Sequence, residues 1–212
     1  MPFIQQKQIA EKQPLIYTIT AVVPHVGVSF VIQKWAEELA TQNENVLIFD
    51  ALLGLKNFPH TNPNTDKIPD VINGWLPLTD LIHSLSKKID VVTGISSQNI
   101  NALSPFNQQR LINDLITLST HYDVVFIDCP AAVTTALFRN LGKTVWVSTP
   151  DQEALIKTLR TLSAHTHPSL ILNKIKNEMQ YNDLSLFIKT LLPEGQLLKF
   201  FEEIPPKNLT FS

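Results

Sequence analysis

The stretch of sequence that decides the fold is Val22-Val23-Pro24-His25-Val26-Gly27-Val28-Ser29-Phe30, at residues 22–30 of the chain. It ends the β-branched run Leu15–Val23, which is typical of a buried strand, and it leads into a segment with apolar residues at helical spacing. A loop between a strand and a helix binds phosphate when glycines expose backbone N–H groups, a lysine faces the terminal phosphates and a serine or threonine binds Mg²⁺. Gly27 and Ser29 fit that pattern, but Val28 stands where the lysine is expected.

The remaining sequence alternates continuously apolar runs with amphipathic helical segments, a pattern that predicts a parallel sheet covered by helices. We therefore predict an α/β fold with a mostly parallel sheet and helices on both faces, formed by a single domain over residues 15–212. Residues 1–14 are predicted to be a flexible N-terminal arm, and residues 57–74, rich in Pro, Asn and Asp, a long loop. Further strands are predicted at 45–50, 89–93, 122–128, 143–148, 170–173 and 196–201, and helices at 29–42, 78–85, 111–116, 151–164 and 184–191.

Composition and charge limit the classes of function that the chain can have. Its 212 residues carry a formal net charge of -2 and a pI of about 6.3, which argues against a generally basic surface for nucleic acid or membrane. The single cysteine, Cys129, excludes an internal disulfide and fits a reducing compartment. No stretch has the length and apolar character of a signal-peptide core or a membrane span. We therefore expect a soluble, cytoplasmic protein.

Two aspartates stand at the ends of predicted strands, where the ligand crevice of a parallel α/β sheet lies. Asp50 ends the strand at 45–50, and Asp128 ends the strand at 122–128. A carboxylate in such a place either holds the water shell of a metal ion or caps the turn that follows. The sequence alone leaves both interpretations open for each aspartate.

Four motifs along the chain match those of one protein family. Residues 23–30 stand at the position of K-G-G-V-G-K-T-T with most of its residues replaced, and residues 50–57 match D-A-D-L-G-L-x-N with one change. Residues 122–132 match the Walker B segment Y-D-x-x-x-x-D-x-P-A-G, and Asn173-Lys174 matches an adenine-side Asn-Arg. In these motifs the chain resembles the MinD/ParA family of deviant P-loop ATPases and, within it, the flagellar-number regulator FlhG. The resemblance spans residues 15–207 in the family's order, and it implies the P-loop NTPase fold of that family.

The resemblance also implies what the departures from these motifs remove. Val23 replaces the lysine that reaches the nucleotide of a partner subunit, and Val28 replaces the lysine that neutralises the β- and γ-phosphates. Leu52 replaces the aspartate that helps to activate the attacking water, and Pro24 has no N–H to offer a phosphate. Because phosphoryl transfer depends on positioning and charge stabilisation, we expect a protein that is not an enzyme and has no catalytic residues, cofactor or metal. Weak binding of ATP or ADP with Mg²⁺ stays open through vestigial binding residues, namely Gly27, Ser29, Asp50, Asp128 and Asn173.

These expectations lead to a hypothesis about function. The chain would be a non-hydrolysing pseudo-ATPase that regulates or positions a protein partner in cell-envelope or polar machinery, such as a flagellum, pilus or secretion system. One alternative is a nucleotide-switched positioning ATPase, and a second is a non-specific DNA-binding ParA relative. The negative net charge argues against nucleic-acid binding. The sequence also shows no basic amphipathic helix of the kind that would give autonomous membrane binding.

The expected partner contact is the loop at 57–74, with Phe58 and Trp75 at its borders. Long loops often carry function, and aromatic side chains dominate binding energies. The alternative is a solvated connection with Trp75 packed in the core. Because Val23 cannot bridge two subunits through ATP, any homodimer is expected to form without nucleotide.

Overall fold

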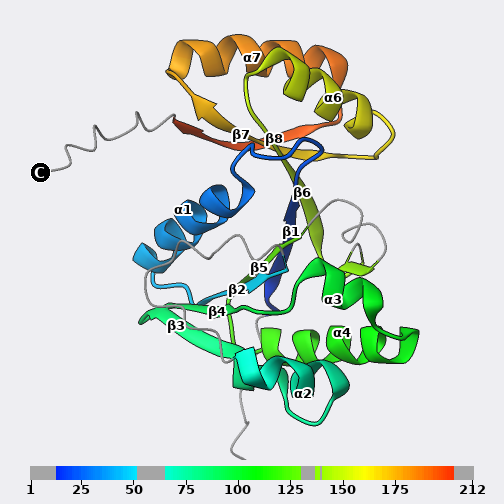
Figure 1. Ribbon diagram of the computed structural model, residues 1–212. Coiled ribbons are helices and arrows are strands. Elements are labelled where there is room, and N and C mark those ends of the chain that lie inside the picture. The colour runs from blue at the N-terminus through cyan, green and yellow to red at the C-terminus, as the bar shows by residue number, and fades with distance from the viewer. Residues whose placement is uncertain (1–12, 52–64, 130–136, 139, 203–212) are drawn as a thin grey trace, which may run out of the picture.

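The computed structural model describes residues 13–51, 65–129, 137–138 and 140–202, and its centre is a sheet of eight described strands (Figure 1). The strand order is β3-β4-β2-β5-β1-β6-β7-β8, and every neighbouring pair is parallel except β3 and β4. The predicted single-domain α/β fold with a mostly parallel sheet is therefore confirmed. The strands are β1 Leu15–Thr20, β2 Val46–Asp50, β3 Ile82–Ser86, β4 Ile89–Val92, β5 Val124–Asp128, β6 Lys143–Ser148, β7 Ser169–Ile175 and β8 Gln196–Glu202.

Helices cover both faces of this sheet. They are α1 Val28–Thr41, α2 Ile68–Asn73, α3 Ser97–Ala102, α4 Pro105–Ser119, α6 Gln152–Leu162 and α7 Glu178–Leu191, with 3-10 turns at Thr65–Lys67 and Leu78–Leu81. Because side chains alternate along a strand, Phe126 packs in the core beneath α1, whereas Ile127 packs beneath α4 on the opposite face. On β6, Val145 packs on the α1 side and Trp146 beneath α6 and α7. The helices α6 and α7 therefore share the face that α4 covers.

The helix predicted at 78–85 is wrong. Leu78–Leu81 forms a single 3-10 turn, and the residues after it form β3, which pairs antiparallel with β4. Ile82 packs with the core on the α4 side, whereas Leu85 packs on the α1 side, so these two side chains point to opposite faces of a strand. Four apolar residues spread over eight positions are too few for their spacing to distinguish a helix from a hairpin strand.

The long loop predicted at 57–74 is wrong over its second half. Residues 57–64 lie outside the described residues, but Ile68–Asn73 forms α2. Pro69 lies in the first turn of α2, where its missing N–H has no helical partner to lose, and Gly74 (φ 84°) ends the helix in the left-handed conformation. Proline and glycine, which favour a loop in the sequence analysis, start and stop a short helix here.

Two further expectations concern membrane-spanning helices and the N-terminal arm. No helix in the described part of the chain is both long and apolar enough to cross a bilayer. The predicted N-terminal arm, residues 1–14, lies almost wholly outside the described residues, so the arm stays a prediction.

Candidate functional site

The loop between β1 and α1 crosses the carboxyl edge of the sheet, where the ligand crevice of this architecture lies (Figure 1). Gly27 ends the loop in the left-handed conformation (φ 89°), and its carbonyl accepts the N–H of Val31 in the first turn of α1. A Cβ atom at Gly27 would collide with the side-chain amide of Asn173. Glycine is therefore required here both by the backbone conformation and by the close approach of β7.

Asn173 of β7 holds the loop in place. Its Nδ2 donates to the Val26 carbonyl at 2.8 Å, and the residue is only 1% exposed. Its buried Oδ1 accepts no hydrogen bond from the described residues. The adjacent Lys174 donates from Nζ to the His25 carbonyl at 3.4 Å, and these two residues have left-handed φ values of 59° and 63°. Non-glycine residues in that region are strained, so two strained positions meet at the rim of the loop.

Ser29 and two aspartates form a buried acidic part of the site. Ser29 Oγ donates to Asp128 Oδ2 at 2.6 Å, and Asp128 lies opposite Asp50 in the register of β5 and β2. Asp128 is 0% exposed and Asp50 is 2% exposed. Burial raises the pKa of Asp128 to about 7, with the hydrogen bond from Ser29 opposing the rise and the charge of Asp50 adding to it. Oxygen ligands of these types are those that Mg²⁺ prefers in proteins.

A hollow of about 520 Å³, within the usual range of small-molecule sites, opens beside the loop. Its lining consists of residues 21–30 and Cys129. Val23 and Val28 line it and pack against the core beneath α1, so they present apolar surface at the positions where lysines are expected. His25 is the only basic side chain among the described residues that line it. The hollow beside the loop is therefore mainly apolar.

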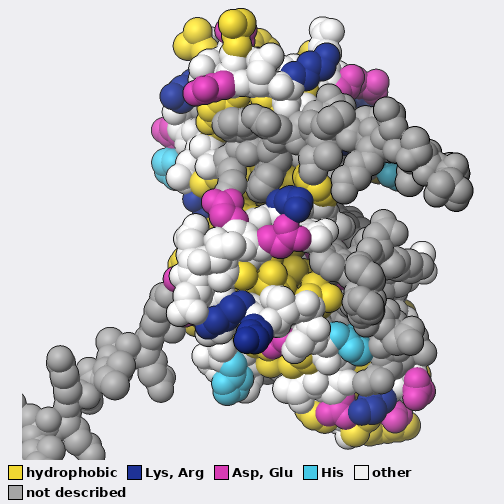
Figure 2. Space-filling model, turned by 90° about the vertical axis from the view of Figure 1, so that its left-hand side faces the viewer, with side chains coloured by type: hydrophobic (Ala, Val, Ile, Leu, Met, Phe, Trp, Pro, Cys, Tyr) yellow, Lys and Arg dark blue, Asp and Glu magenta, His cyan; other side chains and the backbone are white. Residues whose placement is uncertain are grey.

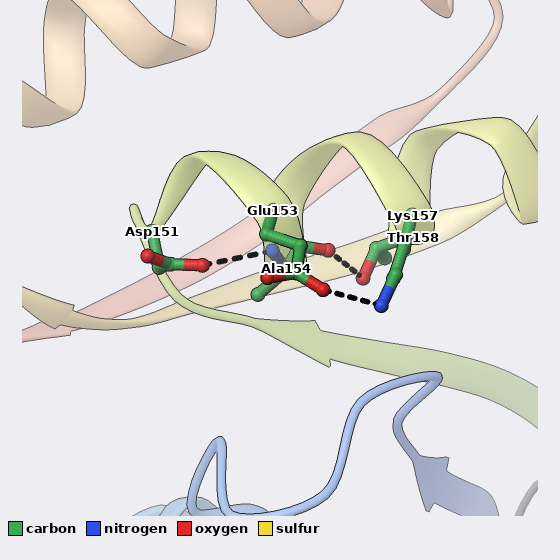
Figure 3. A network of polar contacts seen from close by, with 5 residues as sticks. All are labelled: Asp151, Glu153, Ala154, Lys157 and Thr158. Atoms are coloured by element: carbon green, nitrogen blue, oxygen red, sulfur yellow. Dashed lines mark hydrogen bonds and ion pairs between the residues drawn. The ribbon is translucent and has the colours of Figure 1, made fainter.

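A second hollow, of about 510 Å³, lies between the same loop, the start of α6 and the end of β7. The start of α6 is fixed by Asp151, whose carboxylate accepts the Ala154 N–H at 2.9 Å (Figure 3). Lys174 and Lys176 line this hollow. Cationic side chains thus stand on the side of the loop where the resemblance places the adenine, and they are missing where it places the phosphates.

The residues of the site fit Mg²⁺ but do not fit the phosphates of a nucleoside triphosphate. On the Mg²⁺ side, Ser29 and Asp128 are already paired, and the buried Oδ1 of Asp128 accepts no hydrogen bond from the described residues. On the phosphate side, Val28 replaces the loop lysine and Pro24 has no N–H. A polyanion in the hollow would meet valines next to a buried acid pair, where charge stabilisation needs cations.

The structure brings together the five binding residues predicted from the sequence. Gly27 contacts Asn173, Ser29 bonds to Asp128, and Asp50 lies beside Asp128 on the neighbouring strand. Asn173 was predicted only on the adenine side, and its role as the anchor of the loop was not predicted. A glycine in the middle of a degenerate motif is the one signal of that role, because it marks a backbone that something approaches closely.

Two of the other predicted residues are not described, and the third lies away from this site. Leu52 and Phe58 lie outside the described residues. Trp75 follows α2, a helix that Figure 1 shows at the opposite end of the molecule from the β1–α1 loop, and its side chain is 76% exposed. The alternative in which Trp75 packs in the core is therefore wrong, and Trp75 is an exposed aromatic side chain on a separate surface.

No protein-family model matches this sequence, and no curated protein matches it. Solved structures do match the fold. The MinC:MinD cell division protein complex of Aquifex aeolicus matches at 19% identity and a TM-score of 0.67, over 90% of this chain and 82% of that one. A plasmid partition protein of Borrelia burgdorferi bound to AMPPNP matches at 19% identity and a TM-score of 0.69, over 95% and 92% of the two chains. An ATP complex of a Cyanothece McdA variant matches at 15% identity and a TM-score of 0.64, over 91% and 85%.

These likenesses cover between 90% and 95% of this chain. They confirm the predicted P-loop NTPase fold of the MinD and ParA type. At identities below 20% they are a statement about the fold, and the residues of the loop decide what the fold can do here.

Proposed function

We propose that this chain, which shares the fold of MinD- and ParA-type proteins, is a non-hydrolysing pseudo-ATPase that acts by binding a protein partner. It keeps the sheet and the loop scaffold of that fold and works through its surface instead of through ATP turnover. Its role is to regulate or position a component of polar or cell-envelope machinery, such as a flagellum, pilus or secretion system.

One observation carries the proposal: Val23 and Val28 line the hollow where phosphoryl transfer needs cations. Removing one preorganised electrostatic contact costs about 2.7–4 kcal/mol of transition-state stabilisation. Two missing lysines therefore cost about 5 kcal/mol or more, which slows the reaction by about 10⁴-fold. The replacement of the catalytic aspartate by Leu52, outside the described residues, adds to this loss.

The charge of the chain and its structural neighbours support a protein partner. The MinD of the Aquifex aeolicus structure is bound to another protein, MinC. The net charge of -2 on the present chain gives no support for the DNA-binding alternative, since non-specific DNA binding rests on lysines and arginines.

A second candidate function, a nucleotide-switched positioning protein, is favoured by a specific observation. Ser29, Asp50 and Asp128 keep an arrangement that can hold Mg²⁺, even though the phosphate side of the site has lost its cations. In this alternative, enough affinity remains for Mg²⁺ with ATP or ADP to bind and to shift the protein between two partner-binding states.

Isothermal titration calorimetry with Mg-ATP and Mg-ADP tests the proposal against this alternative. We expect the wild type to bind with a Kd of about 100 µM or weaker, which corresponds to roughly 5 kcal/mol or less. Val28→Lys should tighten binding by about tenfold or more, because a charge-assisted contact contributes about 1.5–3 kcal/mol. Val28→Met is the matched control, since it lengthens the side chain without adding charge. Low-micromolar binding by the wild type would favour the nucleotide-switched alternative.

A further inference from the structure

The helix α7 has two apolar faces, of which only one packs on the protein. Leu184 and Ile188 point to the sheet, in the core cluster that also contains Trp146. Other large apolar residues of the same helix face solvent. They are Met179 (74% exposed), Leu186 (71%), Phe187 (46%) and Leu191 (50%). A helix that is apolar on opposite faces is typically buried on both.

The neighbouring helix α6 shows what a solvent-facing surface looks like in this protein. It lies in the same layer over the sheet, and its exposed side chains include Glu153, Lys157 and Arg160. No large hydrophobic residue of α6 is exposed. Figure 2 shows hydrophobic side chains gathered at the top of the molecule, the level at which Figure 1 places α7. The outer face of α7 therefore differs from an ordinary solvent-facing helix of the same fold.

An acidic residue lies in the middle of this outer face. Met179, Asp183, Leu186 and Phe187 follow the i, i+4, i+7, i+8 spacing of a single helix face. Asp183 is exposed and has no hydrogen bond or ion pair with any described residue. Covering the apolar residues would take its carboxylate out of water, at a considerable cost unless a cation faces it. Any partner on this face must therefore carry a positive charge at its centre.

The need for a positive charge opposite Asp183 distinguishes between the possible binding partners of this helix face. A second copy of α7 does not meet it, because Lys189, the only basic residue of the helix, projects about a third of a turn away from Asp183. An anionic bilayer does not meet it either, because Glu178 and Asp183 would repel the lipid headgroups. A helix with its own apolar stripe can cover the apolar residues of α7, and a lysine or arginine within that stripe supplies the positive charge that Asp183 requires.

We propose that the outer face of α7, formed by Met179, Asp183, Leu186, Phe187 and Leu191, binds an amphipathic helix of a partner protein, whose central lysine or arginine pairs with Asp183. The apolar residues supply contact area, and the charge pair fixes which helix binds and in which register. This surface is independent of the β1–α1 loop, so the inference stands whether or not the loop site hydrolyses ATP.

A photo-crosslinking experiment in cells that naturally make the protein tests this surface. The probe is p-benzoylphenylalanine in place of Leu186, and mass spectrometry identifies the peptide that it captures under ultraviolet light. We expect a peptide of another protein with apolar residues at helical spacing and a lysine or arginine among them. Adding Asp183→Lys should lower the yield of this adduct by about tenfold or more, because like charges then face each other. The matched control places the same probe at Lys157 of α6, where no such adduct is expected.

Several results would overturn the proposal. They are capture of lipid, of a second copy of this chain or of its own residues 203–212, and an adduct yield no higher than at Lys157. An adduct that forms equally well with Asp183→Lys would also overturn it, since the charge pair is its central element. Both probe variants replace exposed side chains, and their circular dichroism spectra should match that of the wild type.

Discussion

Replacing Gly27 with alanine tests how firmly the β1–α1 loop is held. A non-glycine residue in the left-handed conformation that Gly27 adopts (φ 89°) costs about 1–2 kcal/mol. The new Cβ atom also collides with the Asn173 amide and displaces it from the Val26 carbonyl, which leaves buried polar atoms unsatisfied at a cost of about 1–3 kcal/mol. The sum is about 2–5 kcal/mol of unfolding free energy, or roughly 4–20 °C in melting temperature for a chain of this size.

A double-mutant cycle with Asn173→Ala separates these two contributions. When the Asn173 side chain is absent, Gly27→Ala meets no amide, and only the conformational cost of about 1–2 kcal/mol remains. The double mutant should therefore be more stable than the sum of the single effects predicts. The difference is the coupling energy of the contact, about 1–3 kcal/mol.

Urea unfolding followed by circular dichroism gives the four unfolding free energies of the cycle. Effects that add to within about 0.5 kcal/mol would show that Gly27 and Asn173 do not contact each other, and would refute the reasoning. Wild-type stability in Gly27→Ala would refute it as well.

Three further predictions concern Asp128 of the buried acid pair, Val23 at the position of a missing lysine, and the exposed Trp75. Folding raises the pKa of Asp128 from 3.8 to about 7, so the native state keeps a proton that the unfolded state has lost, and wild-type stability falls as the pH rises through this window. Asp128→Asn should flatten that fall in urea titrations at about pH 5 and pH 8, and an unchanged slope would show that Asp128 does not cause it. Mg-ATP should leave the molar mass measured by light scattering unchanged, because Val23 cannot reach a partner's phosphates, whereas an ATP-induced dimer would contradict this role of Val23. Trp75→Ala should change the unfolding free energy by less than about 0.5 kcal/mol, because the side chain is 76% exposed, and a loss above about 2 kcal/mol would reveal a core contact.

The central strands could be predicted because their pattern has one interpretation. Val124–Asp128 is continuously apolar up to its final aspartate, and all five of its residues are buried between helices on both faces. The hairpin strand Ile82–Ser86 could not be predicted in this way, because it lies at the edge of the sheet and the spacing of its two apolar residues, Ile82 and Leu85, also fits a helix.

The two faces of α7 show a second limit of sequence patterns. Leu184, Phe187, Ile188 and Leu191 read as one apolar stripe of a helix that packs on the sheet. In the structure Leu184 and Ile188 pack there, whereas Phe187 and Leu191 face solvent. Spacing along a helix identifies which residues are neighbours, but the rotation of the helix against the sheet depends on the rest of the fold.

The sequence predicted which residues form the candidate site, but it did not predict how they contact one another. Because their motifs follow predicted strands, Ser29, Asp50 and Asp128 were expected at one edge of the sheet, and the strand register places them there. The contact of Asn173 with Val26 joins residues 147 positions apart and depends on the order of β1, β6 and β7. Nothing local in the sequence encodes that order.

The central claim, that this chain does not turn over ATP, is tested most directly by the release of phosphate from Mg-ATP. Asp128→Ala serves as the control, because it removes the carboxylate that holds Ser29. We expect the wild type to release phosphate no faster than this variant or buffer, with or without candidate activators. Steady turnover by the wild type that disappears in Asp128→Ala would contradict it.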